Sequence, residues 1–316
     1  MIAFGPVPSR RLGRSMGINN IPPKICTYSC VYCQLGRTIK MQVERQAFYE
    51  PKEVQSAVQE KVGRARESEE SIDYLTFVPD GEPTLDVNLG REITLLRPLG
   101  IRIAVITNGS LVSREDVRTD LAKADWVSLK VDAASERVWR QVNRPDKALQ
   151  LAAIQEGMLQ FAESYTGKLM TETMLVKDLN DGEEQMREVA EFLTRLRPDI
   201  AYLAIPTRPP AEKWAQPPDE GIVNRAYQVL SESLERVEYL IGYEGNAFAF
   251  TGNVEDDLLS ITSVHPMRED GVSEFLSRAS ADWSTVHQLV AQNQLVETKY
   301  GGHRFFVRRL NTHGED

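Results

Sequence analysis

Residues 26–33 read CTYSCVYC, and this stretch holds all three cysteines of a 316-residue chain. The spacing is C-x3-C-x2-C, at Cys26, Cys30 and Cys33. Three cysteines cannot all form disulfides with one another, and a loop this short can aim three thiolates at one metal centre. We therefore expect a metal site, in a protein of the reducing cytoplasm.

The choice of metal depends on the missing fourth ligand. A structural zinc site takes four ligands, but the loop contains no acid, and the first histidine in the chain is His265. A 4Fe–4S cluster usually takes four cysteines as well. With three, one iron would be open to a ligand from outside the protein. A zinc-stabilised binding module remains the alternative.

Downstream of the loop, apolar strands alternate with amphipathic helices, which predicts βα units and a parallel sheet. We expect five strands after the loop and a sixth at 15–21 before it, too few for a closed eight-fold barrel. The predicted fold is α/β, an open partial (β/α)6 barrel whose chemistry lies at the carboxyl ends of the strands. The five strands lie within 72–78, 101–107, 125–131, 168–176 and 200–206, and the helices within 51–68, 88–98, 114–123, 135–142, 148–165 and 183–196.

The tail has a different pattern. Two short helical stretches, 271–279 and 282–295, precede two strands around Gly301 and Gly302, a hairpin signal. Helix, helix and hairpin are typical of a winged helix. We predict a barrel domain over 1–250, with a capping segment over 1–20, and a winged-helix-like α+β domain over 255–316. No run of 18 or more apolar residues is present, so no membrane span is expected.

Charge bears on possible partners of the tail. The net charge is −9, with basic residues gathered at both ends of an acidic body. The stretch 282–295, which would be the recognition helix, contains neither lysine nor arginine. Phosphate contacts would have to come almost wholly from the hairpin. We therefore favour protein binding, peptide binding or a packing role over nucleic-acid binding for the tail, and a leader peptide is one possible partner.

The cysteine spacing, with an aromatic residue (Tyr32) just before the last cysteine, resembles the signature of radical S-adenosylmethionine (SAM) enzymes. The resemblance implies one 4Fe–4S cluster whose open iron is chelated by SAM. It further implies that one electron from the cluster cleaves SAM to a 5′-deoxyadenosyl radical, which abstracts hydrogen from a substrate. A flavodoxin or ferredoxin would supply the electron.

Three further motifs follow in the family's order, and the resemblance covers roughly 20–210. They are PDGEPTL (79–85), which has Asp80 where the family has the first of two glycines, ITNGS (106–110) and LKVDAAS (129–135). The resemblance implies that Glu82 holds the SAM ammonium and that Tyr32 walls the adenine. The SAM contacts that it implies are Tyr32, Gly81, Glu82, Thr107, Asn108, Lys130 and Asp132.

Within the superfamily, the stretch 4–36 resembles iron–sulfur oxidoreductases related to tRNA wyosine synthases. Those synthases hold a second cluster with cysteines upstream of the SAM motif, whereas this chain has no cysteine outside 26–33. We therefore expect no cysteine-ligated auxiliary cluster, and the substrate stays open between an RNA base (in tRNA), a polypeptide and a small molecule. Cationic side chains near the barrel mouth are the candidate substrate contacts, because they suit phosphate or carboxylate recognition. These are Arg10, Arg11, Arg144, Lys177 and Arg208.

A second class of function is an iron–sulfur regulator, in which the cluster senses redox state and the tail binds nucleic acid. The SAM motifs argue against it, because a sensor needs no Gly-Glu-Pro at the end of the second strand. The sequence therefore favours the enzyme.

Overall fold

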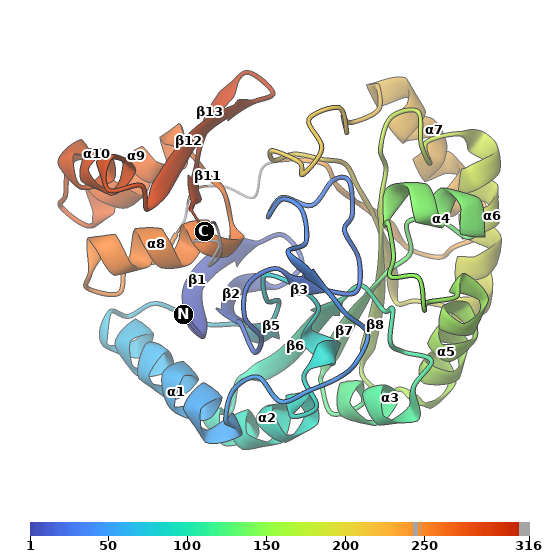
Figure 1. The fold of residues 1–316 in the computed structure, drawn as a ribbon, viewed down its shortest axis with the longest axis horizontal. Coiled ribbons are helices and arrows are strands. Elements are labelled where there is room, and N and C mark those ends of the chain that lie inside the picture. The colour runs from blue at the N-terminus through green and yellow to red at the C-terminus, as the bar shows by residue number, and fades with distance from the viewer. Residues whose placement is uncertain (243–245, 247, 310–316) are drawn as a thin grey trace.

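The computed structural model describes residues 1–242, 246 and 248–309. An eight-stranded sheet curls into an open barrel, with helices on its outer side (Figure 1). The strand order is β1-β2-β5-β6-β7-β8-β9-β10. All neighbours from β2 to β10 are parallel, while β1 is antiparallel to β2. The strands are β1 (Ala3–Ser9), β2 (Gly13–Ile18), β5 (Tyr74–Phe77), β6 (Arg102–Thr107), β7 (Trp126–Lys130), β8 (Lys168–Met174), β9 (Ile200–Ala204) and β10 (Val237–Leu240).

The partial barrel that the sequence predicted is confirmed, with two strands more than expected. The six predicted strands are β2 and β5 to β9, and the structure adds β1 and β10 at the two edges. The six predicted helices are all present, within a few residues of their expected ends. The helices of the barrel are α1 (Pro51–Glu67), α2 (Leu89–Leu96), α3 (Glu115–Leu121), α4 (Glu136–Val142), α5 (Leu151–Ser164), α6 (Glu183–Leu196) and α7 (Glu220–Ser231), with short 3₁₀ turns at Pro83–Leu85 and Arg97–Leu99.

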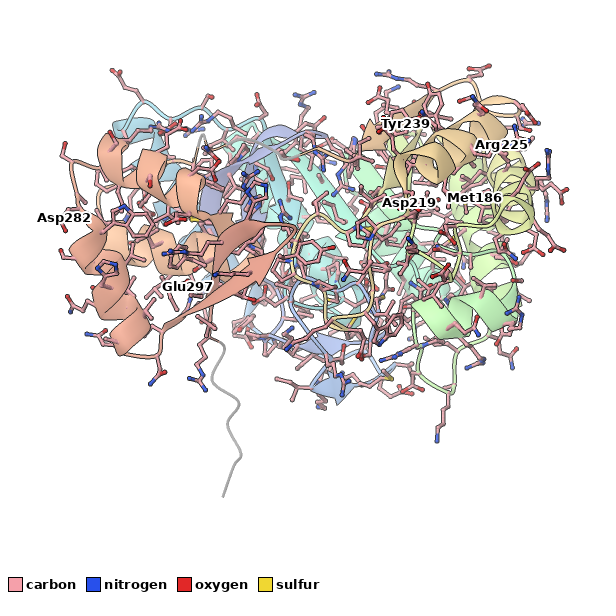
Figure 2. All side chains as sticks on the ribbon, turned by 90° about the horizontal axis from the view of Figure 1, so that it is seen from above. Met186, Asp219, Arg225, Tyr239, Asp282 and Glu297 are labelled. Carbon is pink, nitrogen blue, oxygen red and sulfur yellow. The ribbon has the colours of Figure 1, made fainter. Side chains whose placement is uncertain are left out.

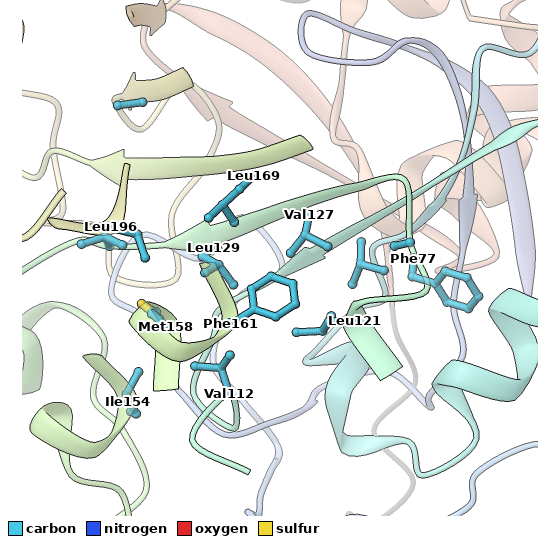
Figure 3. Close-up of a cluster of buried hydrophobic side chains, with 14 of the residues drawn as sticks. Phe77, Val112, Leu121, Val127, Leu129, Ile154, Met158, Phe161, Leu169 and Leu196 are labelled. Carbon is cyan, nitrogen blue, oxygen red and sulfur yellow. The ribbon is translucent and has the colours of Figure 1, made fainter. Parts of the chain in front are cut away.

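The largest core lies between the sheet and these helices. Figure 3 shows Val127 and Leu129 of β7 facing Met158 and Phe161 of α5. All four side chains are almost fully buried. The strands alternate between the two faces of the sheet, so one face fills this core while the other faces the inside of the barrel. This packing fixes the strand ends that form the site.

The N-terminal segment, for which the sequence predicted a cap over 1–20, contains a hairpin of β1 and β2 at the edge of the sheet, and its role as a cap stays a prediction. Strand β1 contains Pro6 and Pro8, and proline is tolerated on an edge strand because it has no N–H to donate to a neighbour. The turn between β1 and β2 carries Arg10 and Arg11 toward the barrel mouth. The segment therefore reaches the mouth as predicted, but as strands.

The C-terminal elements form a unit with its own apolar cluster. They are α8 (Val254–Val264), β11 (Met267–Arg268), α9 (Glu269–Arg278), α10 (Trp283–Ala291), β12 (Leu295–Tyr300) and β13 (His303–Arg308). The predicted order of helix, helix and hairpin is present in α9, α10 and β12–β13. The assignment as a winged helix and the domain boundaries stay predictions. Figure 2 shows this unit, marked by Asp282 and Glu297, at the opposite end of the molecule from Arg225 of α7.

This unit is tied to the barrel through β1 and α1. Val7 of β1 lies in the apolar cluster of the C-terminal unit, and the Ala249 N–H donates to the Pro6 carbonyl at 3.1 Å. Lys61 of α1 forms a buried ion pair with Asp257 of α8 at 2.7 Å. In Figure 1, α8 lies beside β1. No helix among the described residues is long and apolar enough to cross a membrane.

Candidate functional site

A cavity of about 280 Å³ lies at the carboxyl ends of the parallel strands, and all three cysteines line it. Its walls come from the β1–β2 turn, the cysteine loop and the ends of β5 to β10. Ligands of open α/β sheets bind at this edge. The predicted site residues that line the cavity are Arg10, Arg11, Cys26, Cys30, Tyr32, Cys33, Gly81, Glu82, Thr107, Asn108, Lys130 and Arg208.

The cysteine loop is held by short-range bonds. It begins at β3 (Ile25–Cys26), which pairs with β4 (Lys40–Met41). The Cys33 N–H donates to the Cys30 carbonyl at 3.2 Å, and the Gly36 N–H donates to the Cys33 carbonyl at 3.0 Å. These bonds turn the chain so that the three thiols, which form no disulfide, reach one cavity.

Glu82 is anchored at the floor of the cavity. Its Oε1 accepts from the Thr84 N–H at 3.0 Å, the Thr84 hydroxyl at 2.6 Å and the Thr107 hydroxyl at 2.5 Å, and its Oε2 accepts from the Asn108 N–H at 2.8 Å. Burial raises the pKa of Glu82, and these bonds work against the rise. Oε1 has three donors and Oε2 has one, so Oε2 retains room to accept from a ligand.

Gly81 allows the cysteine loop to approach the end of β5. The Glu82 N–H donates to the Ile25 carbonyl at 3.2 Å, and a Cβ added at Gly81 would lie only 1.9 Å from that same oxygen. Only glycine permits so close a backbone contact here. The Gly-Glu pair therefore places a carboxylate next to the first cysteine.

Asp132 lies behind the cavity and positions Tyr32. It is 2% exposed and does not line the cavity. Its carboxylate accepts from the Tyr32 hydroxyl, from Asn143 Nδ2 at 2.6 Å and from the Met174 N–H at 2.8 Å. Asp132 therefore supports Tyr32 from behind the cavity wall, and its direct contact with SAM stays a prediction.

Glu172 is a site residue that the sequence reasoning missed. It lies near the end of β8, lines the cavity, and forms ion pairs with both Lys130 and Arg11. Burial works to raise the pKa of Glu172, but the two cations outweigh it and lower that pKa to about 2. Burial likewise works to lower the pKa of Lys130, and the charges of Glu172 and Asp132 overcome it and raise that pKa. The sequence offered one sign of this role: Glu172 is an acid inside KLMTETMLV, a stretch predicted to be a buried strand.

The candidate substrate contacts separate into two groups. Arg10, Arg11 and Arg208 line the cavity. Arg208 donates to Gln34 Oε1 at 2.7 Å and contacts His265 at 3.1 Å, which connects the cavity to the C-terminal unit.

The structure does not bring Arg144 or Lys177 to the cavity. Arg144 pairs with Glu212 at 2.5 Å, and Lys177 pairs with Asp219 at 3.4 Å. Lys177 follows the end of β8 and Arg144 follows α4, and both side chains turn to acids outside the cavity, one buried (Glu212) and one exposed (Asp219). Asp219 is labelled in Figure 2.

The residues around the cysteines suit a thiolate-ligated cluster. Asn108 Nδ2 lies 3.6 Å from Cys26 Sγ, and Asn143 Nδ2 lies 3.5 Å from Cys30 Sγ, so each can donate to a thiolate. Burial raises the pKa of Cys26, and it raises that of Cys30 to about 12. These thiols would therefore ionise only on binding metal, as cysteine ligands do.

Lys24 adds a buried ammonium beside this loop. Its residue is 7% exposed, and its Nζ has no hydrogen-bond partner among the described residues. Within the described part of the chain, no group of three or more His, Cys, Asp or Glu side chains is arranged to hold a single metal ion. Three thiols on one loop, with two amide donors from elsewhere in the fold and a buried ammonium beside them, suit an anionic thiolate-ligated cluster.

Comparison with known proteins identifies relatives along the whole chain. The family model described as the radical SAM superfamily matches residues 20–193. The UPF0026 protein MJ1312 of Methanocaldococcus jannaschii is 46% identical over 313 residues, which cover 98% of this chain and 97% of that protein. A UPF0026 protein of Helicobacter pylori is 32% identical over 215 residues, 67% of this chain and 68% of its own.

Solved structures share the fold at low identity. A radical SAM methyltransferase from Sphaerobacter thermophilus aligns with a TM-score of 0.51 and 14% identity, over 72% of this chain and 66% of that one. TYW1 with a lysine-pyruvate adduct aligns with a TM-score of 0.53 and 16% identity, over 70% of this chain and 74% of that one. The chain belongs to the radical SAM superfamily and groups with the UPF0026 proteins, and its substrate is unidentified.

Proposed function

We propose that this radical SAM enzyme holds one 4Fe–4S cluster on Cys26, Cys30 and Cys33 and uses it to cleave SAM. When bound, the reduced cluster would supply the electron that converts SAM to methionine and a 5′-deoxyadenosyl radical, which abstracts hydrogen from a substrate. The observation that supports this most is one cavity lined by three thiols, a buried carboxylate and a lysine. The carboxylate matches the ammonium of SAM, and the lysine matches its carboxylate.

The chain's own residues would bind and orient SAM. Glu82, with Oε2 free to accept, would hold the ammonium, since a carboxylate is the natural partner of a charged donor. Lys130 would face the SAM carboxylate, and its bond to Glu172 fixes its position. Tyr32, held by Asp132, would wall the adenine. Thr107 and Asn108 keep the Glu82 carboxylate in place.

Substrate would enter on the side of Arg10, Arg11 and Arg208. These cations suit a phosphate or carboxylate group. An RNA base in tRNA or a polypeptide is the favoured substrate, and the C-terminal unit would dock the rest of that macromolecule. A flavodoxin or ferredoxin would deliver the electron.

The test is anaerobic reconstitution with iron and sulfide, followed by SAM and dithionite without substrate. We expect about four irons per chain and slow formation of 5′-deoxyadenosine. Cys30→Ala should lose iron, while Glu82→Gln should keep iron and weaken SAM binding. Arg144→Gln is the matched control outside the cavity and should behave as the wild type.

Two results would contradict the proposal. Zinc in place of iron after reconstitution would support the zinc-stabilised module. A reducible cluster that neither binds nor cleaves SAM would favour the redox sensor.

A further inference from the structure

Lys24 is the unexplained charge of the cysteine loop. It lies two residues before Cys26, is 7% exposed, and has a left-handed backbone conformation with φ of 64°. Such a conformation is uncommon for a residue other than glycine and is kept only where its surroundings hold it. Here the Lys24 N–H donates to the Asp80 carbonyl at 2.6 Å, and the Lys24 carbonyl accepts from Ile39 and Lys40 at 3.1 Å. The backbone thus directs the side chain inward.

The buried ammonium has neighbours but no hydrogen-bond partner among the described residues. It lies within electrostatic reach of Cys33, Asp80 and Cys26. No hydrogen bond joins it to Asp80, since Lys24 Nζ is buried without a partner in the described part of the chain, as is Asp80 Oδ1. Burying a charge without a partner is unfavourable. A group that brings negative charge to the cysteines would remove that penalty.

We infer that Lys24 is the counter-charge of the thiolate-ligated cluster and raises its reduction potential. This rests on the proposed function, since it requires a cluster on the three cysteines. Reduction transfers one electron from the donor to the cluster and increases its negative charge by one. A fixed cation nearby stabilises the reduced form more than the oxidised form, and net charge and hydrogen bonds to sulfur are what set such potentials.

The arrangement gives each cysteine one electropositive neighbour. The side-chain amides of Asn108 and Asn143 are neutral donors to the sulfur atoms of Cys26 and Cys30, respectively. Lys24 lies beside Cys33: its Nζ would be 3.3 Å from a Cβ built at Gly36, whose N–H binds the Cys33 carbonyl at 3.0 Å. Lys24 alone of the three carries a full charge, so it should have the largest effect on the potential.

The experiment is a redox titration of the reconstituted protein without SAM, followed by electron paramagnetic resonance. Lys24→Met removes the charge and keeps much of the length of the side chain. We expect at least a tenfold fall in the equilibrium constant for reduction, about 59 mV for one electron. Lys24→Arg should stay near the wild type. Lys40→Gln, the same loss of charge at an exposed position on β4, should leave the potential unchanged because water and salt screen it.

A second readout uses the metal-free, reduced protein. An ammonium without a partner is a cost there, so Lys24→Met should be as stable as the wild type or more stable in urea unfolding. A destabilised metal-free Lys24→Met, or an unchanged potential at full iron content, would overturn the inference. Failure of the wild type to load iron would instead refute the proposed function.

Discussion

Gly81 is the position where the fold of the site is easiest to break with one methyl group. A Cβ there would lie 1.9 Å from the Ile25 carbonyl oxygen, and ordinary contact begins at 3.4 Å, so the two backbones must separate by about 1.5 Å. The obstacle is a backbone atom and cannot rotate away. Overpacking of this kind costs roughly 1–3 kcal/mol, and we expect Gly81→Ala to lose about 3 kcal/mol of unfolding free energy.

The same displacement should damage the site. Ile25 precedes Cys26 and Gly81 precedes Glu82, so separating them moves the first cysteine away from the buried carboxylate. The bond from the Glu82 N–H to the Ile25 carbonyl, now 3.2 Å, would lengthen. We therefore expect Gly81→Ala to lose SAM affinity as well as stability, while the three cysteines remain able to bind iron.

The assay is urea unfolding of the metal-free protein under reducing conditions, with SAM binding measured on reconstituted protein. Gly63→Ala is the matched control, because no atom lies within 4 Å of a Cβ added there in α1. Alanine is the better helix former, so this variant should gain roughly 0.5–1 kcal/mol. A Gly81→Ala protein within about 0.5 kcal/mol of the wild type would refute the reasoning, since that lies below the whole range for overpacking.

Three further predictions concern residues outside the cavity. Asp257→Ala should cost roughly 3–5 kcal/mol in urea unfolding, because it removes the ion pair of the buried Lys61 and leaves, among the described residues, the Thr251 hydroxyl at 2.9 Å as its partner. A Lys61→Met, Asp257→Leu double variant should recover most of the loss. Glu92→Gln should stabilise the protein at pH 8 and not at pH 5. Burial, with Asp86 and Asp120 nearby, raises the pKa of Glu92 from 4.5 to about 9, so the carboxyl of the native protein stays protonated at pH 8. The free energy of unfolding of the wild type therefore falls as the pH rises above about 4.5. Equal effects of Glu92→Gln at both pH values would contradict this. Arg144→Gln and Lys177→Gln should change SAM affinity less than about twofold, because both side chains pair with acids away from the cavity, and a larger loss would place them in the site.

The sequence predicted the repeating part of the fold well, because helix and strand periodicity is a local property. It did not predict β1, since Pro6 and Pro8 argue against a strand unless that strand is known to lie at an edge. It also did not predict β10, a four-residue strand at the other edge, nor α7, the helix that precedes it. Strands at sheet edges carry the weakest sequence signal.

The sequence predicts those site residues that belong to a motif. It does not predict residues that reach the cavity only through the pairing of strands. Cys26, Glu82 and Lys130 stand in recognisable order and meet at the cavity. Glu172 carries no motif, and only the pairing of β8 beside β7 shows that it binds Lys130. Arg144, after α4, and Lys177, after β8, show the reverse case, because a position after a helix or a strand does not fix where a loop directs its side chain.

The docking of β1 against the C-terminal unit has a consequence for synthesis. Ala249, whose N–H binds the carbonyl of Pro6 next to Val7, leaves the ribosome 242 residues after Val7. At roughly 5–20 residues per second, that interval is about 12–50 seconds. Throughout it, the nascent chain carries an apolar strand whose cover has not yet been made. Strand β1 can therefore be covered only after the C-terminal unit is made, and a chain stalled before residue 249 would expose that strand to chaperones and proteases.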